Sequence, residues 1–252
     1  MLNEIILALI QALTEFLPIS SDGHLALVSN IIEQPNLFFI TFLHLASLFA
    51  VIIFTRKEIA EILKFKKESW KLIKYLIIGI IPAGLAGLFF SDLIESTLTS
   101  YLLIGIFFLF TGIIVFSTKF IKQPKTPNKL SNKSAFSIGL MQILALLPGV
   151  SRSGMTISTG MFFGIEKEKA VKFSFLMFIP LAIAAFILEA IKYSGEVISI
   201  PSLTLIVSFA VCFLFSILFL NLLNYIVKNN KFWIFGIYCF FIGLVSILLY
   251  IL

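Results

Sequence analysis

The stretch Q-A-L-T-E-F-L-P-I-S-S-D-G-H, which runs from Gln11 to His24, decides how the rest of this chain can be arranged. It places two carboxylates, two adjacent hydroxyls and an imidazole within an otherwise apolar region, and Pro18 breaks the run. Ionisable groups at the depth of a membrane are costly, so their presence there indicates a functional site. A second polar break, L-P-G-V-S-R-S-G-M-T at 147–156, lies in the other half of the chain. We expect the two breaks to meet and form one site.

The composition is typical of a polytopic membrane protein. Of 252 residues, 60% are hydrophobic and only 13% are charged, which is too apolar for a soluble domain. No long hydrophilic segment interrupts the apolar runs, so we expect a single membrane domain over 1–252. The net charge of +6 lies in short segments between apolar runs, which indicates membrane topology and not nucleic-acid binding. Cys212 and Cys239 fall inside apolar runs, so a disulfide framework is not expected.

Six segments are long and apolar enough to cross a bilayer, which takes about 20 residues. They are residues 37–55, 72–90, 99–118, 173–191, 202–227 and 232–252. Two further regions each hold two short apolar stretches around a polar break, namely 3–17 with 24–32 and 134–147 with 155–165. Irregular backbone at membrane depth is tolerated only where protein or a wet cavity covers it. The predicted fold is therefore an all-α integral membrane protein with six transmembrane helices plus two re-entrant helical hairpins, ten helical segments in all.

The basic residues predict the topology. Most of the 19 lysines and arginines fall in four segments, which are 56–71, 119–133, 166–172 and 228–231. The remaining loops contain Lys192 as their one basic residue, and these loops are 33–36, 91–98 and 192–201. By the positive-inside rule the first set is cytoplasmic and the second set is outside, so both termini are expected outside.

An internal repeat follows from this arrangement. Each half, 1–118 and 134–252, is one hairpin followed by three crossings, and the cytoplasmic linker 119–133 joins them. Because three is odd, the second copy starts from the opposite side, which makes the two repeats inverted in topology. A shift of 131 residues places three residues on identical ones: Gln11 on Gln142, Ser20 on Ser151 and Gly23 on Gly154. In inverted-repeat folds the site lies near the midplane, where broken helices face each other.

The second break has the composition of an oxyanion site. A proline and a glycine end one helix, and a serine can cap the next helix, which begins near Gly154. A helix N-terminus favours an anion, and the planar fork of Arg152 matches a phosphate or carboxylate. The predicted phosphate-binding residues are Ser20, Ser151, Arg152, Ser153, Gly154 and Thr156. The alternative is an arginine that pairs with a structural carboxylate or reaches to the membrane interface.

The first break supplies the candidate metal ligands. Gln11 and Glu15 are four residues apart and share one face of a helix. Both carry oxygens, which a hard divalent cation such as Mg²⁺ or Ca²⁺ prefers, and substrate oxygens and water would complete the shell. The alternative is an ordinary hydrogen bond between Gln11 and Glu15 that helps helices pack.

The same break supplies a reaction group. Ser20 and Ser21 can cap a helix or supply a nucleophile, and His24 can act as base, acid or nucleophile. His44 lies in an apolar crossing without such neighbours, so we expect it to be an ordinary core histidine. An anion clamp, a cation, a reaction group and an apolar surround are together suited to phosphoryl transfer on a lipid phosphate.

At these residues the chain resembles the bacterial undecaprenyl-diphosphate phosphatases, integral-membrane proteins linked to bacitracin resistance. The family's first signature is Glu or Gln, three residues, Glu, then F-L-P-x-S-S-x-G-H, and it is present from Gln11 to His24. The second signature, P-G-x-S-R-S-G, is present at 148–154, and the resemblance covers essentially the whole chain. It implies hydrolysis of undecaprenyl diphosphate to undecaprenyl phosphate, the lipid carrier for peptidoglycan, with a divalent cation. It also implies a site open to the outer face of the bacterial plasma membrane.

The resemblance further implies roles for single residues. Glu15 and Gln11 match the metal-associated pair, Arg152 the phosphate clamp, and His24 with Ser21 the reaction centre, in which we favour His24. Gln11 stands where many members have Glu, which should weaken metal binding. Asp22 stands where Thr is common and adds a negative charge beside His24. A lipid-phosphate or anion transporter with the same architecture is the alternative function, and a homodimer stays open.

Overall fold

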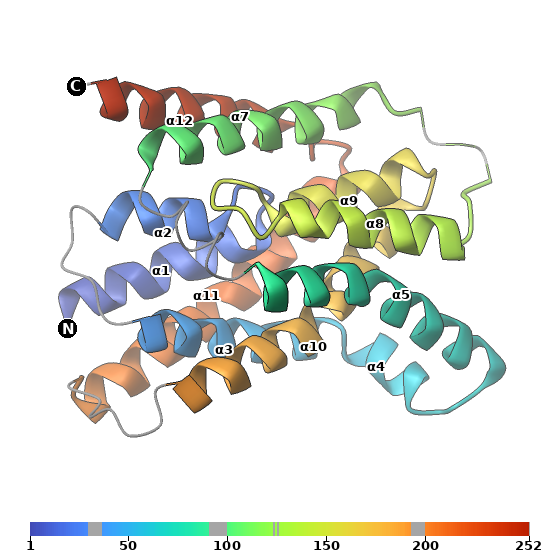
Figure 1. Cartoon of the computed structure of the whole chain (residues 1–252). Coiled ribbons are helices and arrows are strands. Elements are labelled where there is room, and N and C mark those ends of the chain that lie inside the picture. Colours follow the sequence, from blue (N-terminus) through green and yellow to red (C-terminus); the bar gives the residue numbers. More distant parts are fainter. Residues whose placement is uncertain (30–36, 91–99, 123, 125, 193–199, 252) are drawn as a thin grey trace.

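The computed structural model describes residues 1–29, 37–90, 100–122, 124, 126–192 and 200–251, and these are mostly α-helical (Figure 1). The helices of the first half are α1 (Leu2–Phe16), α2 (Ser21–Ser29), α3 (Leu37–Phe54), α4 (Arg56–Ile62), α5 (Lys67–Phe89) and α7 (Tyr101–Ser117). A 3₁₀ turn, η1 (Thr118–Phe120), follows α7. The helices of the second half are α8 (Asn132–Leu144), α9 (Arg152–Phe162), α10 (Lys167–Lys192), α11 (Ser202–Lys228) and α12 (Ile234–Ile251). The predicted all-α class is confirmed.

Five helices of the described chain, α5, α7, α10, α11 and α12, are each long and apolar enough to cross a membrane. The helix α3 passes the same test together with α4, to which it is bent by 72°. The predicted crossings therefore correspond to helices, with ends that differ by several residues where charged turns extend a helix. The sequence did not predict α4, because its basic residues suggested a loop. The segment R-K-E-I-A-E-I nevertheless consists of good helix formers.

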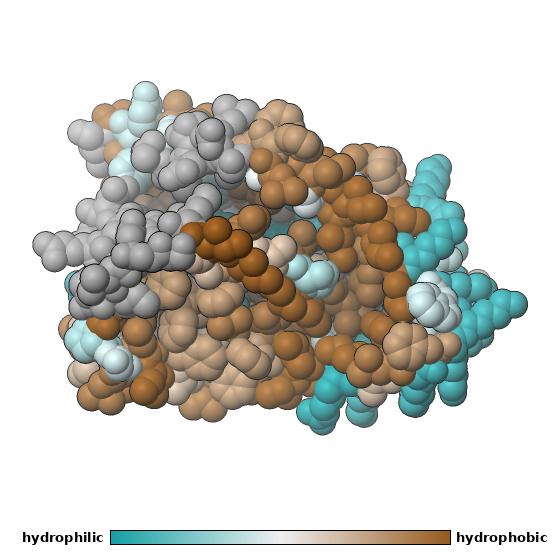
Figure 2. All heavy atoms as spheres, turned by 60° about the horizontal axis from the view of Figure 1, so that its bottom comes forward, coloured by the Kyte–Doolittle hydropathy of each residue, from teal (hydrophilic) through white to brown (hydrophobic). Residues whose placement is uncertain are grey.

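Hydrophilic residues gather at one end of the molecule, where α4 and the start of α5 lie, and the other described residues on the face shown are mostly apolar (Figure 2). The exposed basic residues at this end include Arg56, Lys57, Lys64, Lys66 and Lys67. The loops 33–36 and 91–98 and most of 192–201, which we predicted to lie on the other side, fall outside the described residues.

Two pairs of short helices carry the polar breaks. In Figure 1 the pair α1–α2 begins and ends at the left, the pair α8–α9 begins and ends at the right, and their turns meet in the middle. The helix α1 ends because Leu17, which precedes Pro18, is extended at φ −66° and ψ 145°. The helix α8 ends at Leu144, before Pro148 and Gly149. These breaks place irregular backbone and free helix ends at the centre of the molecule.

The long helices pack in reciprocal pairs. The first helix of each short pair packs against a long helix of the other half: α1 against α11 and α8 against α5. Between the halves α3 packs against α10 and α7 against α12. In the pair α7–α12, a Cβ added at Gly105 would lie 2.9 Å from the carbonyl oxygen of Gly243. A Cβ added at Gly243 would likewise lie 2.9 Å from the carbonyl oxygen of Gly105. Such close approach of small residues is how helices associate in membranes.

Candidate functional site

Direct contacts join the two polar breaks. The Oγ of Ser20 accepts a hydrogen bond from the backbone N–H of Gly149 over 3.0 Å. The Oγ of Ser153 donates to the carbonyl oxygen of Leu17 over 3.2 Å. The expectation that the breaks meet is therefore confirmed.

Unusual backbone conformations hold this junction. Ser20 has φ 65° and Gly149 has φ 97°, and the first is strained for a residue with a side chain. A Cβ on Gly149 would lie 2.5 Å from the carbonyl oxygen of Ile104, so glycine is required for this approach as well. On α7, Thr111 donates from Oγ1 to the carbonyl of Gly149 (2.8 Å) and accepts from the N–H of Ser151 (3.1 Å). The rigid helix α7 thus fixes the start of α9.

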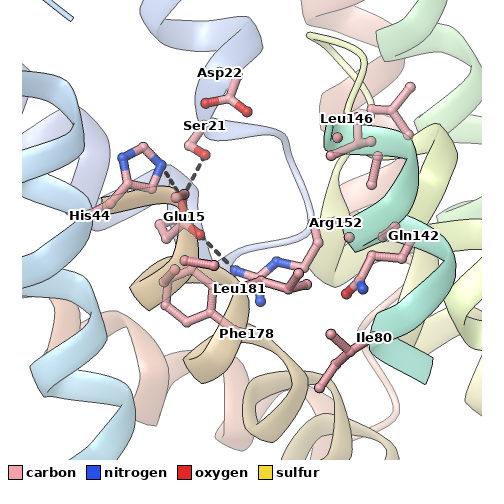
Figure 3. A pocket seen from close by; sticks show the side chains of 18 of the residues that line it. Glu15, Ser21, Asp22, His44, Ile80, Gln142, Leu146, Arg152, Phe178 and Leu181 are labelled. Carbon is pink, nitrogen blue, oxygen red and sulfur yellow. Dashed lines mark hydrogen bonds and ion pairs between the residues drawn. The ribbon is translucent and has the colours of Figure 1, made fainter. Parts of the chain in front are cut away.

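Glu15 is the centre of the polar groups (Figure 3). Its Oε1 accepts from Nη2 of Arg152 over 2.6 Å. Its Oε2 accepts from Oγ of Ser21 over 2.7 Å and from Nε2 of Gln11 over 3.0 Å. Nε2 of His44 lies 3.4 Å from the same oxygen. The Glu15 side chain is only 6% exposed, and a carboxylate this deeply buried is stable only with such partners.

A cavity of about 530 Å³ lies beside this carboxylate. Its polar wall includes Glu15, Ser21, Asp22, His44, Gln142 and Arg152. Its apolar wall comes from Ile80, Ala83, Gly84, Gly87 and Leu88 of α5 and from Phe178, Leu181, Ala182, Ala185 and Leu188 of α10. The guanidinium of Arg152 lies over the Phe178 ring, 4.1 Å from its centroid, where the two walls meet. The cavity can therefore take a ligand with an anionic end and an apolar end.

Five of the ten predicted site residues line the cavity and five do not. Glu15, Ser20, Ser21, Ser151 and Arg152 line the cavity. Gln11 lies behind Glu15 and is fully buried. Ser153, Gly154 and Thr156 lie in the first turns of α9 and do not line the cavity. Ser151 caps this helix by accepting from the N–H of Gly154 over 3.1 Å. The hydroxyls at this end of α9 are already bonded within the protein, since Ser153 donates to Leu17 and Thr156 to the carbonyl of Arg152.

His24 points away from Glu15. Its Nδ1 donates to the carbonyl of Ser20 over 2.7 Å, so its Nε2, 2.8 Å from the hydroxyl of Tyr238, accepts from that group. Its ring stacks on Tyr238 and meets Phe108 edge-on. His24 is not among the residues that line the cavity. Its role as the reacting group stays a prediction, and the geometry favours Ser21 for that role.

His44 and Gln142 line the cavity but were not among the predicted site residues. We expected His44 to be an ordinary core histidine, and this was wrong: its Nδ1 donates to the carbonyl of Ile40 over 2.9 Å, which turns Nε2 toward Glu15. An ionisable residue in an apolar crossing was the available signal. Gln142 also lines the cavity, and its match to Gln11 in the internal repeat was the signal for it.

Known proteins resemble this chain over nearly its whole length. The family model described as "Bacitracin resistance protein BacA" matches residues 4–245, which is nearly the whole chain. The chain belongs to the BacA family. Proteins named "Undecaprenyl-diphosphatase" from Thermosipho africanus, Methanococcus maripaludis and Bacteroides fragilis are 43%, 42% and 42% identical to this chain. The matches cover 97%, 95% and 96% of this chain and 98%, 96% and 96% of the relatives. The resemblance inferred from the two signatures is confirmed.

Proposed function

We propose that this BacA-family protein is an undecaprenyl-diphosphatase. It hydrolyses undecaprenyl diphosphate to undecaprenyl phosphate and inorganic phosphate, which recycles the lipid carrier for peptidoglycan synthesis and gives bacitracin resistance. The observation that carries this proposal is the Glu15–Arg152 pair at the meeting point of a polar and an apolar cavity wall. This arrangement suits a lipid whose diphosphate enters the polar side while its chain remains among apolar residues.

Ser21 is the hydroxyl best placed to react. Its Oγ donates to Glu15 over 2.7 Å, so Glu15 can accept the proton as Oγ forms a bond to the terminal phosphorus. The bond from that phosphorus to the bridging oxygen breaks, and undecaprenyl phosphate leaves with the electron pair. Water then hydrolyses the phosphoserine, which releases inorganic phosphate and restores Ser21. His24, which lies three residues further on, is the alternative reacting group predicted from the sequence.

Arg152 binds oxygens of the lipid diphosphate in this proposal. It begins α9, so the backbone N–H groups of the first turn add to its positive charge at the place where negative charge develops. Its guanidinium is fixed between Glu15 and the ring of Phe178. The positioned charge lowers the barrier because it needs no reorganisation when the phosphoryl group transfers.

A divalent cation, Mg²⁺ or Ca²⁺, fits beside Glu15. Among the described residues no group of three or more His, Cys, Asp or Glu side chains could hold a metal ion by itself. Oxygen donors are nevertheless present: the carboxylates of Glu15 and Asp22, and Oε1 of Gln11, which is buried and has no hydrogen-bond partner. The cation would neutralise phosphoryl charge, and substrate oxygens and water would complete its shell.

The membrane placement is part of the proposal. The two helix pairs are re-entrant hairpins of two inverted repeats in the plasma membrane, with the basic end in the cytoplasm and the site open to the outer face. Entry of the pairs from opposite ends supports this arrangement (Figure 1), as do the reciprocal packing of α1 on α11 and α8 on α5 and the gathering of hydrophilic residues at one end (Figure 2).

The test is phosphate release by the purified protein in detergent with undecaprenyl diphosphate and Mg²⁺. We expect turnover by the wild-type protein and none above background by Glu15→Ala. Inverted repeats are also a transporter architecture, which keeps a lipid-phosphate or anion transporter as the second candidate. Movement of the lipid in liposomes without phosphate release in detergent would favour the transporter and reject the diphosphatase.

A further inference from the structure

Two residues that line the cavity carry three polar atoms that are buried without a hydrogen-bond partner in the described structure. They are Nε2 and Oε1 of Gln142 and Nη1 of Arg152. The Gln142 residue is only 2% exposed, and it lines the same cavity as Arg152. Buried polar groups in folded proteins are nearly always paired, because an unpaired one loses its hydration without compensation. Three such atoms in one cavity indicate a ligand that pairs with them.

The position of Gln142 places this ligand. In Figure 3 Ser21 and Glu15 lie at one side of the cavity, Gln142 lies at the other, and Arg152 lies between them. Nη2 of Arg152 donates to Glu15, and the guanidinium lies over the ring of Phe178. These contacts fix the orientation of the side chain, while Nη1 has no hydrogen-bond partner. Two N–H donor groups without a partner, one charged and one neutral, are therefore present on residues that line the cavity. That combination suits a phosphate.

We propose that Gln142 and Nη1 of Arg152 bind the inner phosphate of the lipid diphosphate, the one that stays on the lipid. This inference rests on the proposed function and extends it. The terminal phosphate lies against Ser21, the inner phosphate lies between Arg152 and Gln142, and the chain continues past Ile80 and Leu181. The subsite thus recognises the inner phosphate, which a lipid diphosphate has and inorganic phosphate lacks. It also donates hydrogen bonds to this phosphate, the leaving group, as the bridging bond breaks.

Gln142→Met tests the subsite because it keeps the size of the side chain and removes the amide. We expect kcat/KM for undecaprenyl diphosphate to fall about tenfold, as expected for a lost hydrogen bond to a charged group. We expect the inhibition constant of undecaprenyl phosphate, whose phosphate occupies the inner subsite, to rise about tenfold as well. Inhibition by inorganic phosphate, which occupies the terminal position, should remain unchanged. Gln142→Glu should weaken binding of undecaprenyl phosphate further, because a carboxylate repels the phosphate.

Thermal unfolding in detergent separates this role from a structural one. Removing a buried amide that has no partner should leave the melting temperature of Gln142→Met unchanged or raised. Ser208→Ala is the matched control, because Ser208 Oγ on α11 is also buried and unpaired but does not line the cavity. This control should bind undecaprenyl phosphate like the wild type.

Direct binding of undecaprenyl phosphate separates this inference from the proposed activity. Absence of hydrolysis by the wild-type protein would reject the proposed function alone, because binding of undecaprenyl phosphate can still be compared between wild type and Gln142→Met. Unchanged binding of undecaprenyl phosphate to Gln142→Met would overturn the inner-phosphate subsite. An equal loss of affinity for inorganic phosphate would overturn it too, because Gln142 would then serve the terminal position.

Discussion

Nη2 of Arg152 lies 2.6 Å from Oε1 of Glu15, although 137 positions of sequence separate the two residues. The pair joins α9 to α1 and so connects the two polar breaks. The first break contains no lysine or arginine, and the second contains no carboxylate. Removing either member leaves the other buried charge without its nearest counter-charge, which is destabilising.

Arg152→Lys should lower kcat/KM by about 10²-fold and Arg152→Ala by about 10³-fold. The lysine keeps the charge but cannot bond Glu15 and a phosphate through a planar fork. Phosphate release from undecaprenyl diphosphate measures both values. Near-normal turnover by Arg152→Ala would contradict the phosphate-clamp role. Arg56→Ala at the hydrophilic end is a control of the same residue type, because its exposed side chain does not line this cavity.

Ser21→Ala should lower kcat by about 10³-fold, because it removes the hydroxyl that donates to Glu15. His24→Ala is the contrasting variant: if His24 is the reacting group, it should abolish turnover while Ser21→Ala keeps some. From the geometry we expect the larger loss from Ser21→Ala. Mass spectrometry after a rapid quench in denaturing detergent at neutral pH, which preserves both phosphoserine and phosphohistidine, tests for a phosphoserine at Ser21. Phosphate on His24 instead would refute the Ser21 mechanism.

Gly84→Leu should obstruct the apolar side of the cavity. A Cβ on Gly84 would meet nothing within 4 Å, so the larger side chain enters open space between α5 and α10. We expect KM for undecaprenyl diphosphate to rise about tenfold while a short-chain prenyl diphosphate is affected less. Gly84→Ala serves as the control, since one methyl group fits the space. Equal effects on long and short substrates would mean that the chain lies elsewhere.

Gly149→Ala should destabilise the protein by about 2 kcal/mol or more, because alanine is strained at φ 97°. The added Cβ would also lie 2.5 Å from the carbonyl of Ile104. Thermal unfolding in detergent measures the loss. The matched control is Gly87→Ala, where a Cβ would meet nothing within 4 Å. A melting temperature equal to that of the wild type would show that the break relaxes easily.

Removal of divalent cations with a chelator should abolish phosphate release, and Mg²⁺ or Ca²⁺ should restore it. Gln11→Glu should lower the cation concentration needed for half-maximal rate by about tenfold, because it adds a charged oxygen ligand beside Glu15. A titration of activity against cation concentration measures this shift. Full activity in excess chelator would reject the cation requirement.

Much of the fold could be read from the sequence because a membrane imposes strong rules on it. Long apolar runs predicted the crossing helices, and the proline, glycine and polar residues at 18–24 and 147–156 predicted the breaks. The helix α4 was missed because charge pattern separates loops from spans but does not separate a loop from a short surface helix.

The sequence by itself determined the family and the chemistry of the two signatures, since Glu15, Ser21 and Arg152 are recognisable by type and spacing within short stretches. Only the tertiary structure decided which of these groups face each other. It turned His24 toward Tyr238, brought His44 to Glu15, and left Gln142 unpaired in the cavity. The physical reason is that a side chain's partners depend on how helices far apart in the chain are rotated and packed against each other, and the two short signatures do not specify that rotation.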